Sequence, residues 1–303
     1  MKTIIIDCDP GIDDALALML AAGSPALDIL AVTTVAGNRP AATTAINGRK
    51  ILDLVGRPDV PVYAGAAVPF GYAAARCNLV HGEDGVGGVD IGPPSALQSG
   101  HSAIRLIEML LGHPERSIDL VATAPLTNLA LAEMLSPGIL RRARTVAIMG
   151  GALRVPGNIT PAAEFNFYAD PLAAQTVLAA GADITLFPLD VTSAAVMSPA
   201  WIRSFGELGS VCGRAAAGML RAYAELDPLL HDACPVAWLI APELFDGEIA
   251  ALDVEWRPGA TEGYVSARFG EQIGARASNA LAMTTVRTQQ LLDLVSDAIA
   301  RLP

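Results

Sequence analysis

The strongest constraint on the fold of this chain is a regular alternation of short, wholly apolar runs with Ala- and Leu-rich helical runs. The predicted strands are 3–8, 29–35, 118–122, 145–149, 184–189 and 249–256. Strands that are apolar throughout are typical of sheets buried on both faces. The predicted helices between them are 13–22, 40–55, 103–111, 126–135, 171–180 and 233–241. Such connections predict an α/β fold: a single open, mainly parallel sheet with helices on both faces.

The chain shows no sign of being divided into separate units. No low-complexity linker, internal repeat or shift in composition interrupts it, so we expect residues 1–303 to form one domain. The longest irregular stretches are 65–92 and 150–167, and loops of that length in a compact enzyme are usually functional. Asp170 followed by Pro171 predicts an N-cap at the start of a helix.

Charge and hydropathy exclude several classes of protein. The chain has 20 Lys and Arg against 31 Asp and Glu, a formal charge of −11, which argues against a nucleic-acid-binding surface. No charge-free run reaches 18 residues, so no membrane span is expected. The apolar run before Asp7 is too short for a signal-peptide core. Four cysteines without CxxC spacing favour a reduced, cytoplasmic enzyme.

A cluster of aspartates follows the first predicted strand. The segment DCDPGIDDA contains Asp7, Asp9, Asp13 and Asp14. In open α/β sheets, ligands bind beyond the carboxyl ends of the strands, which is where this segment lies. Its Pro-Gly pair predicts a tight turn that lets the acids converge. Carboxylates this close repel one another unless a cation holds them together.

These aspartates predict a metal site rather than a phosphate site. Carboxylate oxygens without a nearby Cys or His indicate a hard cation, Ca²⁺ or Mg²⁺. The segment lacks the glycine patterns of phosphate-binding loops, and its negative charge would repel phosphate. The alternative is helix capping, since acids near a helix start complement the helix dipole. Capping accounts for Asp13 or Asp14 but not for all four aspartates.

DCDPGIDDA closely resembles the opening motif of the inosine–uridine preferring nucleoside hydrolase family. Five later segments resemble motifs of the same family in the same order: TTVAGN, HGEDGVGG, VATAPLTNLALA, GNITPAAEFNFYADP and LLHDACPVAWLIAP. The resemblance runs from Asp7 to at least Ala241. It implies a Rossmann-like nucleoside hydrolase fold and calcium-dependent hydrolysis of the N-glycosidic bond of ribonucleosides, which releases free base and ribose.

The resemblance also implies which residues carry the reaction. Asp9 is the expected general base for the attacking water. His231 is the first candidate for the acid that protonates the leaving base, and His81 is the second. One Ca²⁺ per subunit is expected to bind three side chains and one backbone carbonyl: Asp9, Asp14, Asp232 and Thr123, the last through its carbonyl.

The remaining expected site residues contact substrate: Asp13, Asn38, His81, Asn158, Glu164, Asn166 and Tyr223. We expect residues 164–166 to be extended, so that Glu164 and Asn166 share one face. No Lys or Arg lies within these motifs, which predicts free ribonucleosides rather than 5′-phosphates as substrates.

Base preference is predicted from the site residues, and assembly and pathway are implied by the resemblance. His81, His231 and Tyr223 offer polar contacts to a small ring, and no aromatic pair for stacking a purine is evident, so we expect a preference for pyrimidine nucleosides. The resemblance implies a homodimer or homotetramer, a small-molecule ribonucleoside as partner and a role in purine or pyrimidine salvage.

Two other classes of protein fit part of the sequence. A haloacid-dehalogenase-like, Mg²⁺-dependent phosphotransferase also has Asp-x-Asp after its first strand, but it would want a downstream Lys, and this chain has only Lys2 and Lys50. An inactive, Ca²⁺-stabilised nucleoside- or sugar-binding protein of the same fold is the other alternative.

Overall fold

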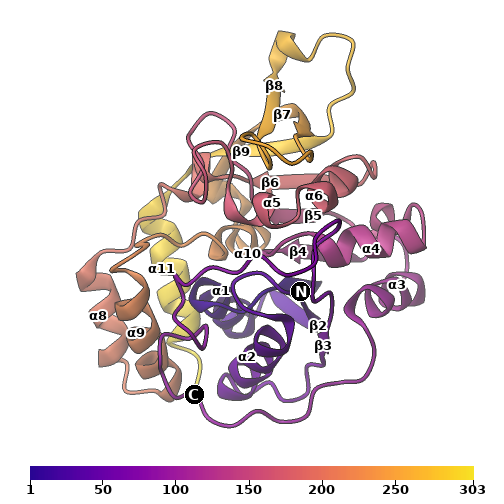
Figure 1. Cartoon of the computed structure of the whole chain (residues 1–303). Helices are drawn as coiled ribbons and strands as arrows, with labels where there is room; N and C mark the ends of the chain where they lie inside the picture. Colours follow the sequence, from indigo (N-terminus) through magenta and orange to yellow (C-terminus); the bar gives the residue numbers. More distant parts are fainter.

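A nine-stranded sheet forms the centre of the structure, a computed structural model that describes residues 1–303 (Figure 1). The strands are β1 Lys2–Cys8, β2 Leu27–Thr34, β3 Val62–Ala64, β4 Ile118–Ala122, β5 Val146–Met149, β6 Ile184–Phe187, β7 Phe245–Val254, β8 Val265–Phe269 and β9 Ala280–Val286. Their order is β3-β2-β1-β4-β5-β6-β9-β7-β8. The first seven strands of this order, which end with β9, are parallel to their neighbours. Strand β7 runs antiparallel to both β9 and β8.

Helices cover both faces of the sheet, and each face has its own hydrophobic core. The helices of one face are α1 Ile12–Gly23, α2 Ala41–Leu54, α8 Pro199–Glu207, α9 Val211–Tyr223, α10 Ala233–Ile240 and α11 Thr288–Ile299. Those of the other face are α3 Ser102–Gly112, α4 Thr127–Leu135 and α6 Pro171–Leu178. In β1, Ile4 and Ile6 enter the first core and Ile5 the second. The predicted mainly parallel α/β sheet is therefore confirmed.

The predicted elements up to residue 241 agree with the structure to within about two residues at their ends. Asp170 caps α6 as predicted, because its side chain accepts a hydrogen bond from the backbone N–H of Ala173. The extended conformation predicted for 164–166 is wrong. Glu164 is the N-cap of a short helix, α5 Phe165–Ala169, and its side chain accepts hydrogen bonds from the backbone of Asn166 and Phe167.

Several elements are absent from the sequence prediction. They are the short strand β3, the strands β8 and β9, the short helix α7 Leu189–Thr192, the helices α8, α9 and α11, and the 3₁₀ turns Ile139–Arg142, Pro242–Leu244 and Gly270–Ile273. Strand β7 begins four residues before the predicted start at Ile249. The strand β8, VSARF, is only partly buried and so lacks the continuous apolar run from which the other strands were predicted.

The point where the strand order reverses lies between β1 and β4. From β1 the chain winds outward through β2 and β3 on one side and through β4, β5 and β6 on the other. Ligands of open α/β sheets bind at such a switch point, beyond the carboxyl ends of the strands. DCDPGIDDA ends β1 and starts α1, and Thr123 directly follows β4, so both segments meet there.

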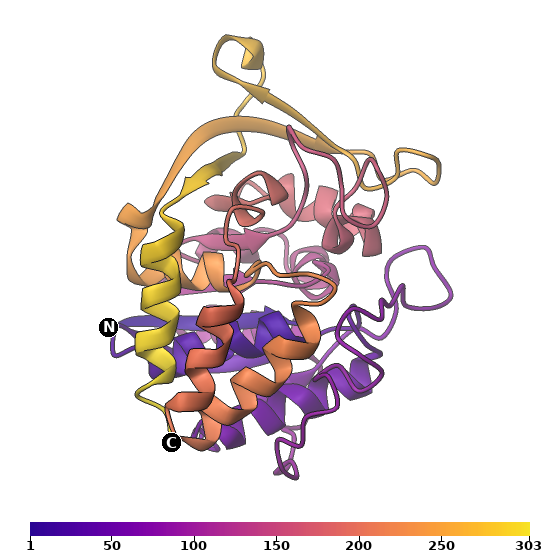
Figure 2. The ribbon, with the colours of Figure 1, turned by 90° about the vertical axis from the view of Figure 1, so that its left-hand side faces the viewer.

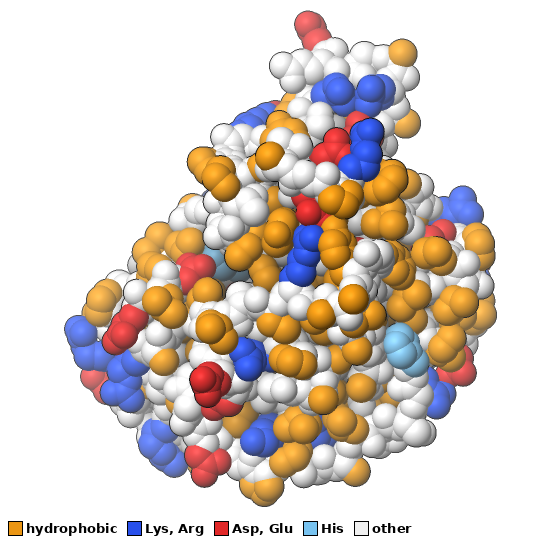
Figure 3. All heavy atoms as spheres, viewed as in Figure 1, with side chains coloured by type: hydrophobic (Ala, Val, Ile, Leu, Met, Phe, Trp, Pro, Cys, Tyr) orange, Lys and Arg blue, Asp and Glu red, His pale blue; other side chains and the backbone are white.

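Strands β7 and β8 extend away from the rest of the molecule as a curved arm, which is at the top of Figure 2. On the face seen in Figure 3, basic side chains are scattered among acidic and apolar ones and form no single patch. None of the helices combines the length and the apolar character needed to cross a membrane.

Candidate active site

The four acids that we call the acidic cluster, Asp9, Asp13, Asp14 and Asp232, are buried together at the switch point. Carboxylate oxygens of Asp13, Asp14 and Asp232 lie within 4.8 Å of one another. Asp9 is outside that group of three but is linked to it through Asn38. The turn after β1 thus brings Asp13 and Asp14 together with Asp232, whereas Asp9, which was expected to converge with Asp13 and Asp14, lies outside this group of three.

Asn38, which follows β2, connects the acids to one another. Its backbone N–H donates to the carboxylate of Asp9. Its side-chain Nδ2 donates to Asp14 Oδ2 at 3.2 Å and to the Asp9 carbonyl oxygen at 3.3 Å. Gly37 permits this approach, because a Cβ there would clash with the Asp9 carboxylate. Asn38 was predicted to contact substrate, and here its amide also positions two acids.

Two oxygens of the acidic cluster, Asp9 Oδ1 and Asp232 Oδ2, are buried without a hydrogen-bond partner. Burial, followed by the charge of Asp14, raises the pKa of Asp9 well above its ordinary value. Burial and the charge of Asp13 raise the pKa of Asp14 to about 7. Burial, followed by the charges of Asp13 and Asp14, also raises the pKa of Asp232.

The raised pKa values reflect buried carboxylates that repel one another, a repulsion that a bound cation would relieve. Unpaired buried carboxylate oxygens are costly in a protein interior unless they are paired or coordinate a metal. The donor set is made of oxygens only, which suits a hard divalent cation. The acidic cluster therefore fits a metal ion by both its charge and its donor chemistry.

Thr123 and Asn166 link the acidic cluster to the opposite side of the site. The Thr123 hydroxyl donates to Asp14 Oδ1 at 2.8 Å. The Thr123 carbonyl, the predicted metal ligand, accepts from Asn166 Nδ2 at 3.0 Å. That amide also donates to the Met149 carbonyl at 3.3 Å, and its own Oδ1 is left without a protein donor. Asn166 therefore has an acceptor oxygen available to a ligand.

Glu164 and Asn158 shape the segment that carries Asn166. The Glu164 carboxylate accepts three backbone hydrogen bonds, from Gly151 at 2.8 Å, Asn166 at 2.8 Å and Phe167 at 3.2 Å. Burial nevertheless leaves the pKa of Glu164 raised. Asn158 Oδ1 accepts from the backbone N–H of Phe165 at 2.9 Å. Both residues line the cavity as predicted, and both also hold α5 in place.

His81 is held by a backbone hydrogen bond that its ring accepts. Its Nδ1 accepts from the backbone N–H of Ile12 at 3.1 Å, so the ring proton is on Nε2, which lies 3.7 Å from Asp13 Oδ1. Burial lowers the pKa of His81. Its ring stacks on Tyr223, with centroids 5.1 Å apart, and the Tyr223 hydroxyl donates to Asp13 at 3.4 Å. A neutral His81 suits binding better than proton donation.

His231, unlike His81, has a carboxylate next to its ring. Its Nε2 lies 3.2 Å from Asp227 Oδ2, and its Nδ1 lies 2.8 Å from the Thr192 hydroxyl. Burial lowers the pKa of His231, but the hydrogen bond and charge of Asp227, with other nearby carboxylates, outweigh burial and leave it raised. Both ring nitrogens of His231 face protein partners, and its raised pKa favours the protonated form, so His231 is the better candidate of the two histidines for an acid.

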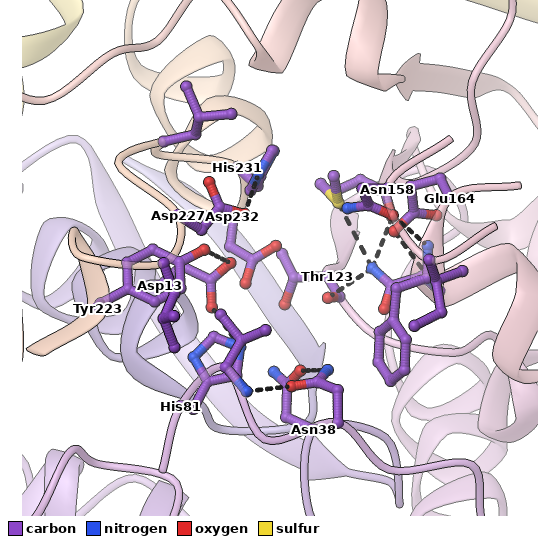
Figure 4. A pocket seen from close by; sticks show the side chains of 18 of the residues that line it. Asp13, Asn38, His81, Thr123, Asn158, Glu164, Tyr223, Asp227, His231 and Asp232 are labelled. Carbon is purple, nitrogen blue, oxygen red and sulfur yellow. Dashed lines mark hydrogen bonds and ion pairs between the residues drawn. The ribbon is translucent and has the colours of Figure 1, made fainter. Parts of the chain in front are cut away.

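A cavity of about 440 Å³ opens above the acidic cluster (Figure 4). Ten predicted site residues line it: Asp13, Asn38, His81, Thr123, Asn158, Glu164, Asn166, Tyr223, His231 and Asp232. Asp9 and Asp14 are fully buried and do not line the cavity.

Nine further residues line the cavity and were missed by sequence reasoning: Asn78, Val80, Met149, Ile159, Phe165, Leu226, Asp227, Pro228 and Leu229. Asn78 donates from Nδ2 to Asn38 Oδ1 at 2.9 Å. Of these nine residues, only Asp227 could have been predicted from the sequence, because a carboxylate four residues before His231 can pair with that histidine.

The geometry defines an α/β protein with an acidic cluster that could hold a metal ion beneath a cavity lined by amides and histidines. The sequence matches the model of the inosine-uridine preferring nucleoside hydrolase family over residues 4–293. It is 37% identical to the pyrimidine-specific ribonucleoside hydrolase RihA of Klebsiella pneumoniae and 38% identical to an uncharacterized protein of Schizosaccharomyces pombe. The alignments cover 98% of both chains for the former and 99% of both for the latter.

The structure is similar to that of a purine-preferring ribonucleoside hydrolase from Gardnerella vaginalis, with a TM-score of 0.92 and 27% identity over 99% of this chain and 98% of that one. The chain therefore belongs to the inosine–uridine preferring nucleoside hydrolase family. By class it is an enzyme that hydrolyses ribonucleosides at the N-glycosidic bond.

Proposed function

We propose that this protein is a calcium-dependent ribonucleoside hydrolase with a preference for pyrimidine nucleosides, in which residues 1–303 act as one catalytic domain. The observation that carries the proposal is the acidic cluster at the switch point, directly beneath a cavity lined by amides and histidines. Cleavage of a ribosyl C–N bond develops positive charge on the sugar, as in glycoside hydrolysis. Fixed carboxylates beside the sugar stabilise that charge.

One Ca²⁺ per subunit would be held by Asp9, Asp14 and Asp232 and by the Thr123 carbonyl. When bound, the ion would supply charge compensation for these acids and Lewis acidity toward water. The two unpaired oxygens of Asp9 and Asp232 support this set. Asp13, whose oxygens lie close to those of Asp14 and Asp232, stands at the border between the metal and the ribose.

The remaining steps, proton transfer and substrate binding, are assigned to side chains of the protein. Asp9 Oδ1 has no protein partner and is proposed to accept the proton of the attacking water. His231 is proposed to donate a proton to the departing base, for which one ring N–H must leave its partner, Asp227 or the Thr192 hydroxyl. The ribose hydroxyls are proposed to be held by Asp13, Asn38, Asn158, Glu164 and Asn166. His81 and Tyr223 are proposed to contact the base.

Two observations support the pyrimidine preference. RihA, at 37% identity, is described as pyrimidine-specific, while the purine-preferring enzyme from Gardnerella vaginalis is only 27% identical. The aromatic residues that line the cavity are Phe165 and Tyr223, and none of the three tryptophans does so. The cavity thus has no indole ring on which a purine could stack.

Assays with uridine, cytidine and inosine test the proposal, with ultraviolet absorbance reporting cleavage and a reducing-sugar assay reporting ribose. We expect both products in equal amounts, and higher kcat/KM for uridine and cytidine than for inosine. Nucleoside binding by calorimetry without release of base would instead identify an inactive binding protein of the same fold. Faster hydrolysis of inosine would overturn only the base preference.

The proposal also covers the oligomeric state, the cellular compartment and the pathway of the enzyme. We propose a homodimer or homotetramer that works in nucleoside salvage in the cytoplasm. The four cysteines are all free, which agrees with a reducing compartment. Light scattering of the purified protein gives the number of subunits.

A further inference from the structure

We propose that Arg76 is a positioning residue that ties the active-site loop, residues 65–101, to the opposite side of the cavity. The proposal rests on the nucleoside hydrolase activity proposed above, whose substrate the loop would contact. The loop follows β3 and has no helix or regular strand, yet it supplies Asn78, Val80 and His81 to the cavity. Arg76 itself does not line the cavity, so any effect it has on substrate must act through these neighbours.

The Arg76 guanidinium joins three separate segments. Its Nη1 donates to the Tyr168 carbonyl in α5 at 2.7 Å. Its Nη2 donates to both carboxylate oxygens of Glu262, at 3.0 and 3.2 Å, in the turn between β7 and β8. Its central carbon lies 3.9 Å from the ring centroid of Tyr72 and 4.3 Å from that of Tyr168. The Tyr72 hydroxyl also donates to Glu262.

The partners of Arg76 are themselves fixed. Glu262 is only 6% exposed. The next residue, Gly263, has φ +81°, and a Cβ there would lie 2.9 Å from the Tyr168 Cα and 3.0 Å from the Ala163 Cβ. The turn between β7 and β8 therefore rests directly on α5. In Figure 2 this turn and the first part of the active-site loop project on the same side of the molecule.

Arg76 lies in a stretch of the loop between two fixed points, Phe70 and Asn78. Phe70 is fixed by its N–H, which donates to Asp170 at 3.0 Å. Asn78 is fixed by its bond to Asn38. Between them, the side-chain hydrogen bonds of residues 71–77 come only from Tyr72 and Arg76. Loss of Arg76 would release the chain immediately before Asn78.

The two sides that Arg76 joins are the two sides of the cavity. Asn78 and His81 line it from the loop, and Phe165 and Asn166 line it from α5. The planar guanidinium holds two partners at once, Tyr168 through Nη1 and Glu262 through Nη2, and a lysine ammonium has no second nitrogen with which to reproduce this. Because the acidic cluster makes no contact with Arg76, loosening the loop should weaken nucleoside binding while the chemical step is retained.

The test compares Arg76→Met, Arg76→Lys and Glu262→Gln with a matched control, Arg257→Met. Arg257 pairs with Glu255 in the same turn, but it is 73% exposed and touches neither the loop nor α5. We expect KM for uridine to rise about tenfold in Arg76→Met and Glu262→Gln, with kcat within about twofold of the parent. Arg76→Lys should restore little of the loss, and the control should match the parent.

Hydrogen exchange supplies a readout that does not need turnover. We expect amides of residues 77–88 to exchange faster in Arg76→Met and Glu262→Gln than in the parent or Arg257→Met. The double variant should raise KM no further than one single variant, because both changes break the same contact. If Arg76→Met does not fold, the KM and the hydrogen exchange of Glu262→Gln and Arg76→Lys are compared with those of the parent and the control instead.

Unchanged KM and unchanged exchange at 77–88, with only a lower melting temperature, would overturn the proposal and leave Arg76 a purely structural residue. A fall in kcat at unchanged KM would also overturn it. If the parent protein hydrolyses no nucleoside, the proposed function fails, and the exchange comparison still decides whether Arg76 positions the loop.

Discussion

The acidic cluster and the active-site loop reach the same cavity by different means. The acids Asp9, Asp13 and Asp14 directly follow a buried strand, and Asp9 and Asp14 accept hydrogen bonds from residues that follow neighbouring strands, Asn38 after β2 and Thr123 after β4. The loop is irregular and is held by side chains that contact segments far away in the sequence, such as Glu262. The comparison indicates that Asp9 and Asp14 are placed by the ends of adjacent strands, whereas the loop that carries Asn78 and His81 has no regular element and depends on side-chain contacts for its position.

The largest effect should come from changing the substrate. We expect kcat/KM for deoxyuridine and for uridine monophosphate to be lower than for uridine by about 10⁴-fold. Asp13 and Asn166 would lose a hydroxyl partner in the deoxynucleoside, and no Lys or Arg lines the cavity to meet a phosphate. Parallel assays of the three compounds measure this. Monophosphate hydrolysis as fast as that of uridine would contradict the assignment of the cavity.

The next largest effect should come from Asp9→Asn, which keeps the shape of the side chain but removes the proton acceptor. We expect kcat for uridine to fall by more than about 10²-fold, with a small change in nucleoside affinity. Steady-state kinetics with calorimetric binding measures both quantities, and circular dichroism checks the fold. Near-normal turnover would remove Asp9 from the chemical step.

A third prediction separates the two histidines. We expect His231→Gln to lower kcat for uridine by about 10²-fold, because the protonated ring donates to the leaving base. His81→Gln should act mainly on KM, because the ring accepts a hydrogen bond from the backbone of Ile12 and burial favours its neutral form. Nitrophenyl riboside, whose leaving group departs as a stable anion, serves as the control. His231→Gln should retain activity on it, and an equal loss on both substrates would argue against His231 as the acid.

The smallest effect should come from Tyr223→Phe. The substitution keeps the ring stacked on His81 and removes the hydroxyl that faces Asp13. Loss of one hydrogen bond of about 1 kcal/mol predicts a rise in KM of about fivefold. Uridine kinetics measures it, and a change in kcat alone would place Tyr223 nearer to the chemistry than to base binding.

The same contrast explains how much the sequence predicted. Strands β1, β2, β4, β5 and β6 follow from continuous apolar runs, and Asp9, Asp13 and Asp14 lie in one local motif, so these features were predictable. Asn78 and Arg76 were not, because their partners, Asn38 and Tyr168 among them, are remote in sequence. Residues 164–166 were mispredicted as extended because the alternation of polar and apolar residues concealed the N-cap geometry of Glu164.

The most direct test of the central claim is the metal content of the purified protein, measured together with uridine hydrolysis before and after chelation. Three buried acids that cannot all stay ionised alone predict about one Ca²⁺ per chain. Chelation should abolish hydrolysis and added Ca²⁺ should restore it, while Asp232→Asn should bind the ion weakly. Protein that contains mainly zinc, or that hydrolyses uridine fully without any metal, would contradict the account.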